Sequence, residues 1–223
     1  MPELDFNVTG VDAATRGLAP LLHFKLKITT AAAEPIQALL LNAQIQIQSP
    51  QRSYTDSEKH KLVELFGTPE RWGQTLRNRL WTHANVTVGN FTKETEVVLA
   101  VPCSYDLNLA AAKYFYALDG GEIPLLFLFS GSIFYTTTEG RLQVERVSWN
   151  KECMYRLPVH EWKHLMEQHY PNSEWLYLQR ETFDRLWAYK RQNGLATWEQ
   201  TIEQLLATVG SPQNDQRTQE VIA

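Results

Sequence analysis

The segment LLHFKLKIT, residues 21–29, alternates strictly between apolar and polar side chains. Its apolar set is Leu22, Phe24, Leu26 and Ile28, and its polar set is His23, Lys25 and Lys27. A period of two places each set on its own face of a β-strand, so the segment predicts a strand with one face in a core and one in water. Residues 41–48, LNAQIQIQ, repeat the pattern. The two segments together predict a sheet with one solvated face, which is typical of antiparallel structure.

Five further segments have the composition of strands: residues 4–11, 81–88, 95–101, 123–137 and 141–149. The last two flank the tetrapeptide TEGR, in which Glu139 and Gly140 suit a tight hairpin turn. Seven strands with turn signals between them are the number expected of a two-sheet sandwich. The chain has no βαβ alternation that would predict a parallel sheet. The sequence therefore predicts an α+β protein built on an antiparallel β-sandwich, with the β-sandwich domain over residues 1–156.

A small helical insertion is predicted near residues 55–77 of this domain. Thr55 and Glu58 have the spacing of a capping box, and Gly67 suits the end of the helix. Apolar residues between them supply the buried stripe of the helix. For residues 110–118, AAAKYFYAL, both a short helix and a strand stay open.

From residue 157 the apolar period changes to 3.6, which predicts a C-terminal three-helix segment packed against the sandwich. The helices are expected over residues 158–170 and 182–193, and from Thr197, where Gln200 completes a second capping box. This segment would span residues 157–209. Residues 210–223 are polar and predicted to be a disordered tail.

The charge and the composition of the chain indicate which classes of partner and which cellular compartment to expect. The formal net charge is −4, and no cluster of lysine or arginine stands out. Both observations argue against nucleic acid as a binding partner. The most apolar stretch, residues 123–135, is shorter than the ~20 residues of a membrane span, and the N-terminus lacks the apolar segment of a signal peptide. Cys103 and Cys153 are too few for a disulfide-built scaffold, so we expect free thiols in a reducing cytoplasm.

The run His160-Glu161-Trp162-Lys163-His164 matches the zinc-protease pattern H-E-x-x-H. On a helical wheel both histidines lie on the polar face, away from Trp162. His169 lies on the opposite side of the helix from this pair, and no other residue is a clear third ligand. We therefore expect surface histidines and no metal or other cofactor. A zinc-dependent hydrolase using His160, Glu161 and His164 is kept as an alternative.

Other catalytic patterns are missing from the sequence. No glycine-rich phosphate loop and no G-x-S-x-G motif is present. Cys103 and His83 could form a thiol–imidazole pair across facing strands, but no spacing rule supports one.

The stretch RWGQTLRNRLW holds the residue types that are enriched in protein interfaces: Arg71, Trp72, Arg77, Arg79 and Trp81. These five form the candidate interaction site. The alternative is a solvated loop whose arginines lie over its tryptophans. A further alternative for the seven tryptophans of the chain is a small-ligand or carbohydrate-binding sandwich with exposed indoles.

Three long segments, residues 44–83, 101–134 and 155–186, make the chain resemble a bacterial family, the domain of unknown function numbered 6084. The resemblance extends over most of residues 1–207. It implies genes beside those of uptake [NiFe]-hydrogenases and their maturation factors, and it supplies no catalytic residues. We therefore expect a non-enzymatic accessory protein in the cytoplasm, with a hydrogenase subunit or a maturation factor as its protein partner.

Overall fold

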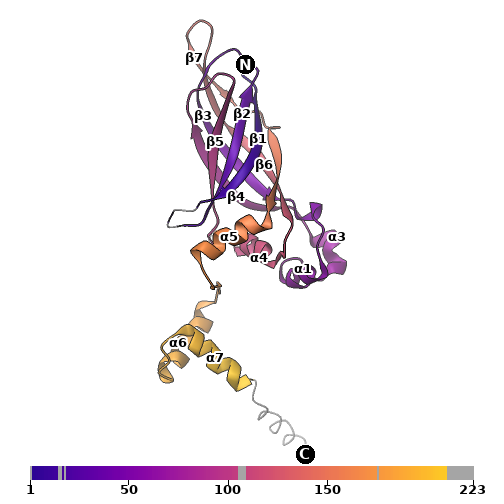
Figure 1. The fold of residues 1–223 in the computed structure, drawn as a ribbon, viewed down its shortest axis with the longest axis vertical. Coiled ribbons are helices and arrows are strands. Elements are labelled where there is room, and N and C mark those ends of the chain that lie inside the picture. Colours follow the sequence, from indigo (N-terminus) through magenta and orange to yellow (C-terminus); the bar gives the residue numbers. More distant parts are fainter. Residues whose placement is uncertain (1, 15–16, 18, 105–108, 175, 210–223) are drawn as a thin grey trace, which may run out of the picture. The chain divides into compact units, whose positions relative to one another are not determined.

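The computed structural model describes residues 2–14, 17, 19–104, 109–174 and 176–209. Contacts divide the chain into two units, Met1–Ser173 and Glu174–Ala223, and each is described by itself (Figure 1). The predicted tail, 210–223, lies outside the described residues. The first unit extends beyond the predicted boundary at residue 156, because helix α5 (Val159–His169) packs on the strands.

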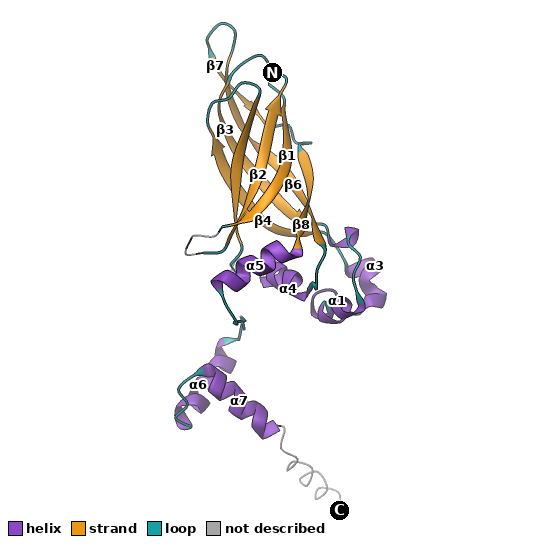
Figure 2. Ribbon diagram, viewed as in Figure 1, coloured by secondary structure: helices purple, strands orange, loops and turns teal. Residues whose placement is uncertain are grey.

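Eight strands lie within the described residues and form two antiparallel sheets (Figure 2). The first sheet has the order β1-β2-β5, with β1 (Leu4–Ala13), β2 (Leu21–Thr30) and β5 (Glu94–Pro102). The second has the order β4-β3-β6-β7, with β8 also paired to β6: β3 (Ile36–Ile47), β4 (Arg79–Val88), β6 (Glu122–Thr136), β7 (Leu142–Arg146) and β8 (Glu152–Pro158). Together with the helices they make an α+β fold, as the alternation predicted.

The sheets face each other across a single apolar core. The ring of Phe24 on β2 meets Trp81 on β4 edge-on at 6.3 Å and Phe127 on β6 at 5.2 Å, centroid to centroid. The sheets also approach at their edges, where the Val8 amide of β1 donates to Cys153 Sγ of β8 at 3.3 Å. The inward residues of β2 and β3 are buried at the alternate positions that their sequence predicts. The architecture is therefore a two-sheet sandwich.

Strand β6 is the centre of the second sheet and changes partner along its length. Its first half pairs with β8 and its second half with β7. Gly131 lies between the halves with φ 155°, and a Cβ there would meet the Leu40 carbonyl oxygen at 2.0 Å. Only glycine fits so close an approach. The interruption of this apolar stretch by Ser-Gly-Ser therefore has a structural cause.

Strand β8 was not predicted from the sequence. Its residues Cys153, Tyr155 and Leu157 turn inward, whereas Met154 and Arg156 are exposed. This is a period of two, but it is short and mixes apolar and charged residues on the outward face. The predicted seventh strand, residues 141–149, ends at Arg146 in the structure.

The helices of the first unit gather at one end of the sandwich (Figure 2). The predicted insertion is present as α1 (Asp56–Lys61), α2 (Val63–Phe66) and α3 (Trp72–Thr75), with short 3₁₀ turns at Ser49–Gln51 and Pro69–Arg71. The capping box of Thr55 and Glu58 is confirmed. The open question over residues 110–118 is settled as a helix, α4 (Leu109–Ala117). No helix of the described residues has the length and apolarity to cross a membrane.

The second unit is a helical hairpin of α6 (Arg180–Gln192) and α7 (Trp198–Val209). The predicted capping box at its second helix is confirmed. The backbone amide of Gln200 donates to Thr197 Oγ1, and the backbone amide of Thr197 donates to the side-chain oxygen Oε1 of Gln200. Gly194 ends the preceding helix with φ 61°.

Candidate interaction surface

The histidines of the H-E-x-x-H match lie on the exposed face of α5. The His160 side chain is 77% exposed, and its Nε2 is 3.4 Å from Glu161 Oε1. His164 Nε2 is 2.8 Å from the Gln168 side-chain amide. The opposite face buries Val159, Trp162, Leu165 and Met166. Among the described residues no three His, Cys, Asp or Glu side chains are grouped to hold a metal. The predicted orientation of the helix is therefore confirmed.

The Arg/Trp stretch does not form one continuous exposed patch. Trp81 is 5% exposed and lies in the core, with its ring 5.0 Å from that of Phe115. Trp72 is half-buried, and its indole N–H donates to the Gly67 carbonyl at 2.9 Å. Because the Trp81 ring belongs to the core, it is not available to a partner.

The arginines of the stretch also differ in exposure. The Arg79 guanidinium lies 4.7 Å from the centroid of the Phe66 ring and donates to the Leu65 carbonyl. Arg71 and Arg77 are exposed. The arrangement is closer to the alternative of arginines lying over aromatic rings, although the ring that Arg79 covers is a phenylalanine.

Cys103 and His83 are not brought together. Cys103 is buried, and its thiol donates to the Val101 carbonyl at 3.4 Å. Burial raises the pKa of the Cys103 thiol to about 12. His83 is exposed on β4. A thiol with so high a pKa is not an activated nucleophile.

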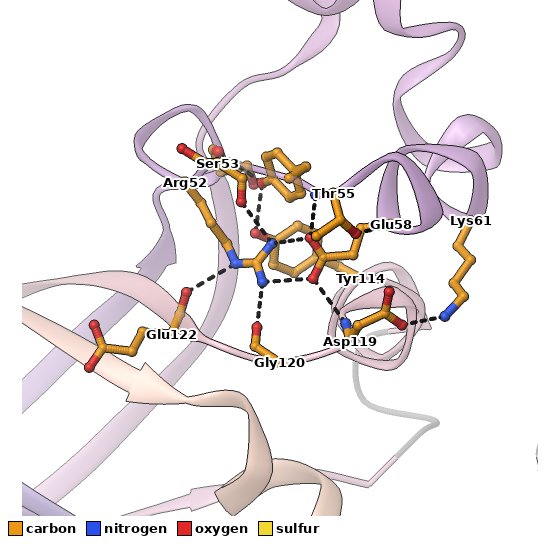
Figure 3. A network of polar contacts seen from close by, with 11 residues as sticks. Arg52, Ser53, Thr55, Glu58, Lys61, Tyr114, Asp119, Gly120 and Glu122 are labelled. Carbon is orange, nitrogen blue, oxygen red and sulfur yellow. Dashed lines mark hydrogen bonds and ion pairs between the residues drawn. The ribbon is translucent and has the colours of Figure 1, made fainter.

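A buried polar network joins the helical insertion to the turn before β6 (Figure 3). The side chains of Arg52 and Glu58 are 9% and 2% exposed and form two hydrogen bonds of 2.8 and 2.9 Å. Arg52 also donates to the carbonyls of Ser53, Gly120 and Glu122. Since a guanidinium has five N–H groups, all its donors are used inside the protein. The network therefore stabilises the fold, and the Arg52 guanidinium has no free N–H donor for a ligand.

The carboxylate of Glu58 is equally saturated. Besides Arg52, it accepts from the backbone amides of Thr55 and Asp119. Burial by itself raises the pKa of Glu58, but these hydrogen bonds and the charge of Arg52 outweigh it, so the pKa lies below its ordinary value. Beside the pair, the hydroxyls of Tyr54 and Tyr114 are 2.8 Å apart. Burial raises the pKa of both phenols.

The helical hairpin of the second unit differs from the first unit because it has almost no core. Of the described residues after Met166, Thr201 alone is buried. Phe183, Trp187 and Trp198 form an aromatic cluster, with centroid distances of 5.3 to 6.3 Å. Even so, the second unit leaves several large apolar side chains exposed, two of them before α6 and four on the hairpin: Leu176, Tyr177, Phe183, Trp187, Ile202 and Leu206. Contiguous apolar surface of this kind marks interaction sites.

A groove of about 470 Å³ lies among these side chains. Its apolar walls are Leu176, Tyr177, Leu178, Phe183, Leu186, Trp198 and Ile202. The remaining lining residues are Glu174 and Glu199, both acidic. The lining of the groove is therefore mostly apolar, with two carboxylates.

Sequence reasoning identified the hairpin helices but not this surface. The period of 3.6 predicts that one face of each helix is covered, and we assigned that face to the sandwich. The signal that points to the groove is the number of large apolar side chains relative to the length of the two helices. Two helices of 13 and 12 residues carry more large apolar side chains than they can cover between themselves.

Several solved structures are distantly similar to this chain. One is the CARDB domain of a Pyrococcus furiosus protein in complex with di-metal ions, at 9% identity and a TM-score of 0.27, covering 70% of this chain and 87% of that one. Another is a putative late embryogenesis abundant protein, at 15% identity and 0.30, covering 71% and 73%. A third is a β-glucosidase from Kluyveromyces marxianus, at 6% and 0.24, covering 70% of this chain and 15% of the enzyme.

No curated protein matches the chain. The family comparison is decisive in contrast, because one model, described as a family of unknown function (DUF6084), matches residues 1–214. That range takes in both the sandwich and the hairpin. The chain therefore belongs to the family of unknown function DUF6084.

Proposed function

We propose that the chain is a non-enzymatic accessory protein that binds another protein through the hairpin α6–α7. The observation that carries the proposal is the exposed apolar surface around the groove. Isolated helices shorter than ~12–15 residues are marginal in water, and stability then comes from packing of an apolar face. Leu206 and Tyr177 are 66% and 73% exposed, so the hairpin itself does not supply that packing. A partner that covers these side chains would do so.

The partner that we propose is a [NiFe]-hydrogenase subunit or maturation factor. The support is the gene neighbourhood that the family resemblance implies, together with the interaction surface. The cytoplasm is the compartment that this partner and the two free, buried cysteines favour.

Affinity capture from the organism that carries the gene tests this role. The bait is the full chain, compared with Ile202→Glu/Leu206→Glu in the hairpin and with Leu142→Glu/Val144→Glu as a matched control. Leu142 and Val144 lie on β7 and are 62% and 56% exposed, compared with 37% and 66% for Ile202 and Leu206. We expect the wild-type and control baits to capture a hydrogenase protein and the hairpin variant to lose it.

Two results would contradict the proposal. One is capture of the same hydrogenase protein by all three baits, which would place the interaction elsewhere on the chain. The other is capture of no hydrogenase protein together with unchanged hydrogenase activity after deletion of the gene. Circular dichroism at 222 nm checks that the hairpin variant keeps its helical content.

A further inference from the structure

The apolar surface of the hairpin is a stripe rather than a closed pocket. It starts at Leu176 and Tyr177, follows the groove that Phe183 and Trp198 line, and continues along α7 through Ile202 to Leu206. Helix α7 has 12 residues, which corresponds to a length of roughly 18 Å. An apolar helix face lying in a groove buries side chains spaced over several turns, and a stripe of this length matches that binding mode.

The charged residues that line the groove are carboxylates. Glu174 and Glu199 line the groove, and Glu203 follows one turn later on α7. Helix α7 contains no lysine or arginine. Lys190 of α6 lies with its ammonium 5.6 Å from the centroid of the Trp198 ring, and this ammonium donates to the carbonyls of Leu195 and Ala196. A ligand in the groove therefore meets the carboxylates of Glu174 and Glu199, whereas the Lys190 ammonium already has two carbonyl acceptors.

We infer that the groove receives an amphipathic helix of the partner protein whose apolar face is flanked by lysine or arginine. The inference rests on the proposed role of the hairpin and adds the chemistry of the partner. The apolar side chains provide the area to be buried, and the carboxylates select a basic flank over an acidic one. The partner's helix completes the helical core that α6 and α7 leave open.

Two labelled peptides test the inference by fluorescence anisotropy with the full chain. Both are 18-residue helices with the same leucine face; one carries lysine and the other glutamate on its polar face. We expect the leucine–lysine peptide to bind about ten-fold more tightly or better. In Glu174→Lys/Glu199→Lys the preference falls to about equality or reverses.

The matched control is Glu181→Lys/Asp184→Lys on α6, which changes the net charge by the same amount outside the groove. Glu181 also lies in the first turn of its helix, as Glu199 does, so both variants lose the same favourable interaction with the helix dipole. We expect the control to keep the preference of the wild type within about two-fold.

Three outcomes overturn the inference: no binding of the leucine–lysine peptide, equal binding of both peptides, or an equal loss of preference in the groove variant and its control. A fourth is a chain that sediments as a dimer and dissociates on Ile202→Glu, because a second copy would then occupy the groove. The peptides need no native partner, so a negative result beside successful hydrogenase capture overturns this inference alone. Capture unaffected by the hairpin variant would overturn the proposed function instead.

Discussion

Replacing Arg52 by methionine is expected to destabilise the first unit strongly, because it leaves the Glu58 carboxylate buried without its cation. Methionine is apolar and flexible enough to fill the space of the arginine stem. Removal of one partner of a buried ion pair costs about 3–5 kcal/mol. The amides of Thr55 and Asp119 still donate to Glu58, so we expect a value near the lower limit, about 3 kcal/mol.

The assay is urea denaturation followed by circular dichroism at pH 7, supported by thermal melting. For a unit of this size each kcal/mol corresponds to about 2–4 °C, so the midpoint should fall by roughly 6–12 °C. The matched control is Lys59→Met, which breaks the exposed pair with Asp56, whose side chains are 38% and 98% exposed. Its expected cost is about 0–1 kcal/mol. A loss for Arg52→Met no larger than that of the control would refute the reasoning.

The same variant should show a pH dependence of known sign. In the wild type the pKa of Glu58 is depressed, so its contribution to stability is present above the ordinary glutamate value of 4.5 and is lost as pH falls through the lower folded-state value. Without Arg52 the carboxyl group has no cation, and its protonation relieves the buried charge. The difference in unfolding free energy between wild type and variant should therefore be largest near neutral pH and shrink below about pH 4.5. A difference that grows on acidification would contradict this assignment.

Two further predictions concern Gly131 on β6 and the H-E-x-x-H match on α5. Gly131→Ala should lower the unfolding free energy by about 2 kcal/mol or more, because its Cβ meets the Leu40 carbonyl, whereas Gly89→Ala, with open space at the Cβ, should change it by about 0.5 kcal/mol or less. Equal effects in urea denaturation would show that the strand adapts. Untagged protein dialysed against excess zinc and then against buffer should retain less than about a tenth of an equivalent of zinc. The reason is that His160 and His164 have no third ligand grouped with them among the described residues. Retention of one equivalent of zinc that is lost in His160→Ala would support the hydrolase alternative.

The parts of the fold that could be predicted are those in which one strand or helix carries its own periodicity. Alternation in β2 and β3 gave the buried face of each strand, and the wheel of α5 placed Trp162 inward and His160 outward. These predictions depend only on the local repeat and on the existence of a core. Strand β8 was missed because it has seven residues and its outward face mixes apolar and charged side chains. So short and irregular an alternation does not predict a strand.

An interaction surface is hard to assign from sequence for a different reason. Trp81 and Trp187 have the same side chain, and each is next to arginine or lysine within a few residues. Their environments differ because Trp81 lies on a strand that another sheet covers, whereas Trp187 lies on a hairpin in which Thr201 is the only buried residue among those described. Local composition cannot separate the two, since exposure is set by how much apolar area the rest of the unit can cover. Counting the apolar side chains of a unit against the length available to bury them is the test that distinguishes them, and it favours the hairpin over the Arg/Trp stretch.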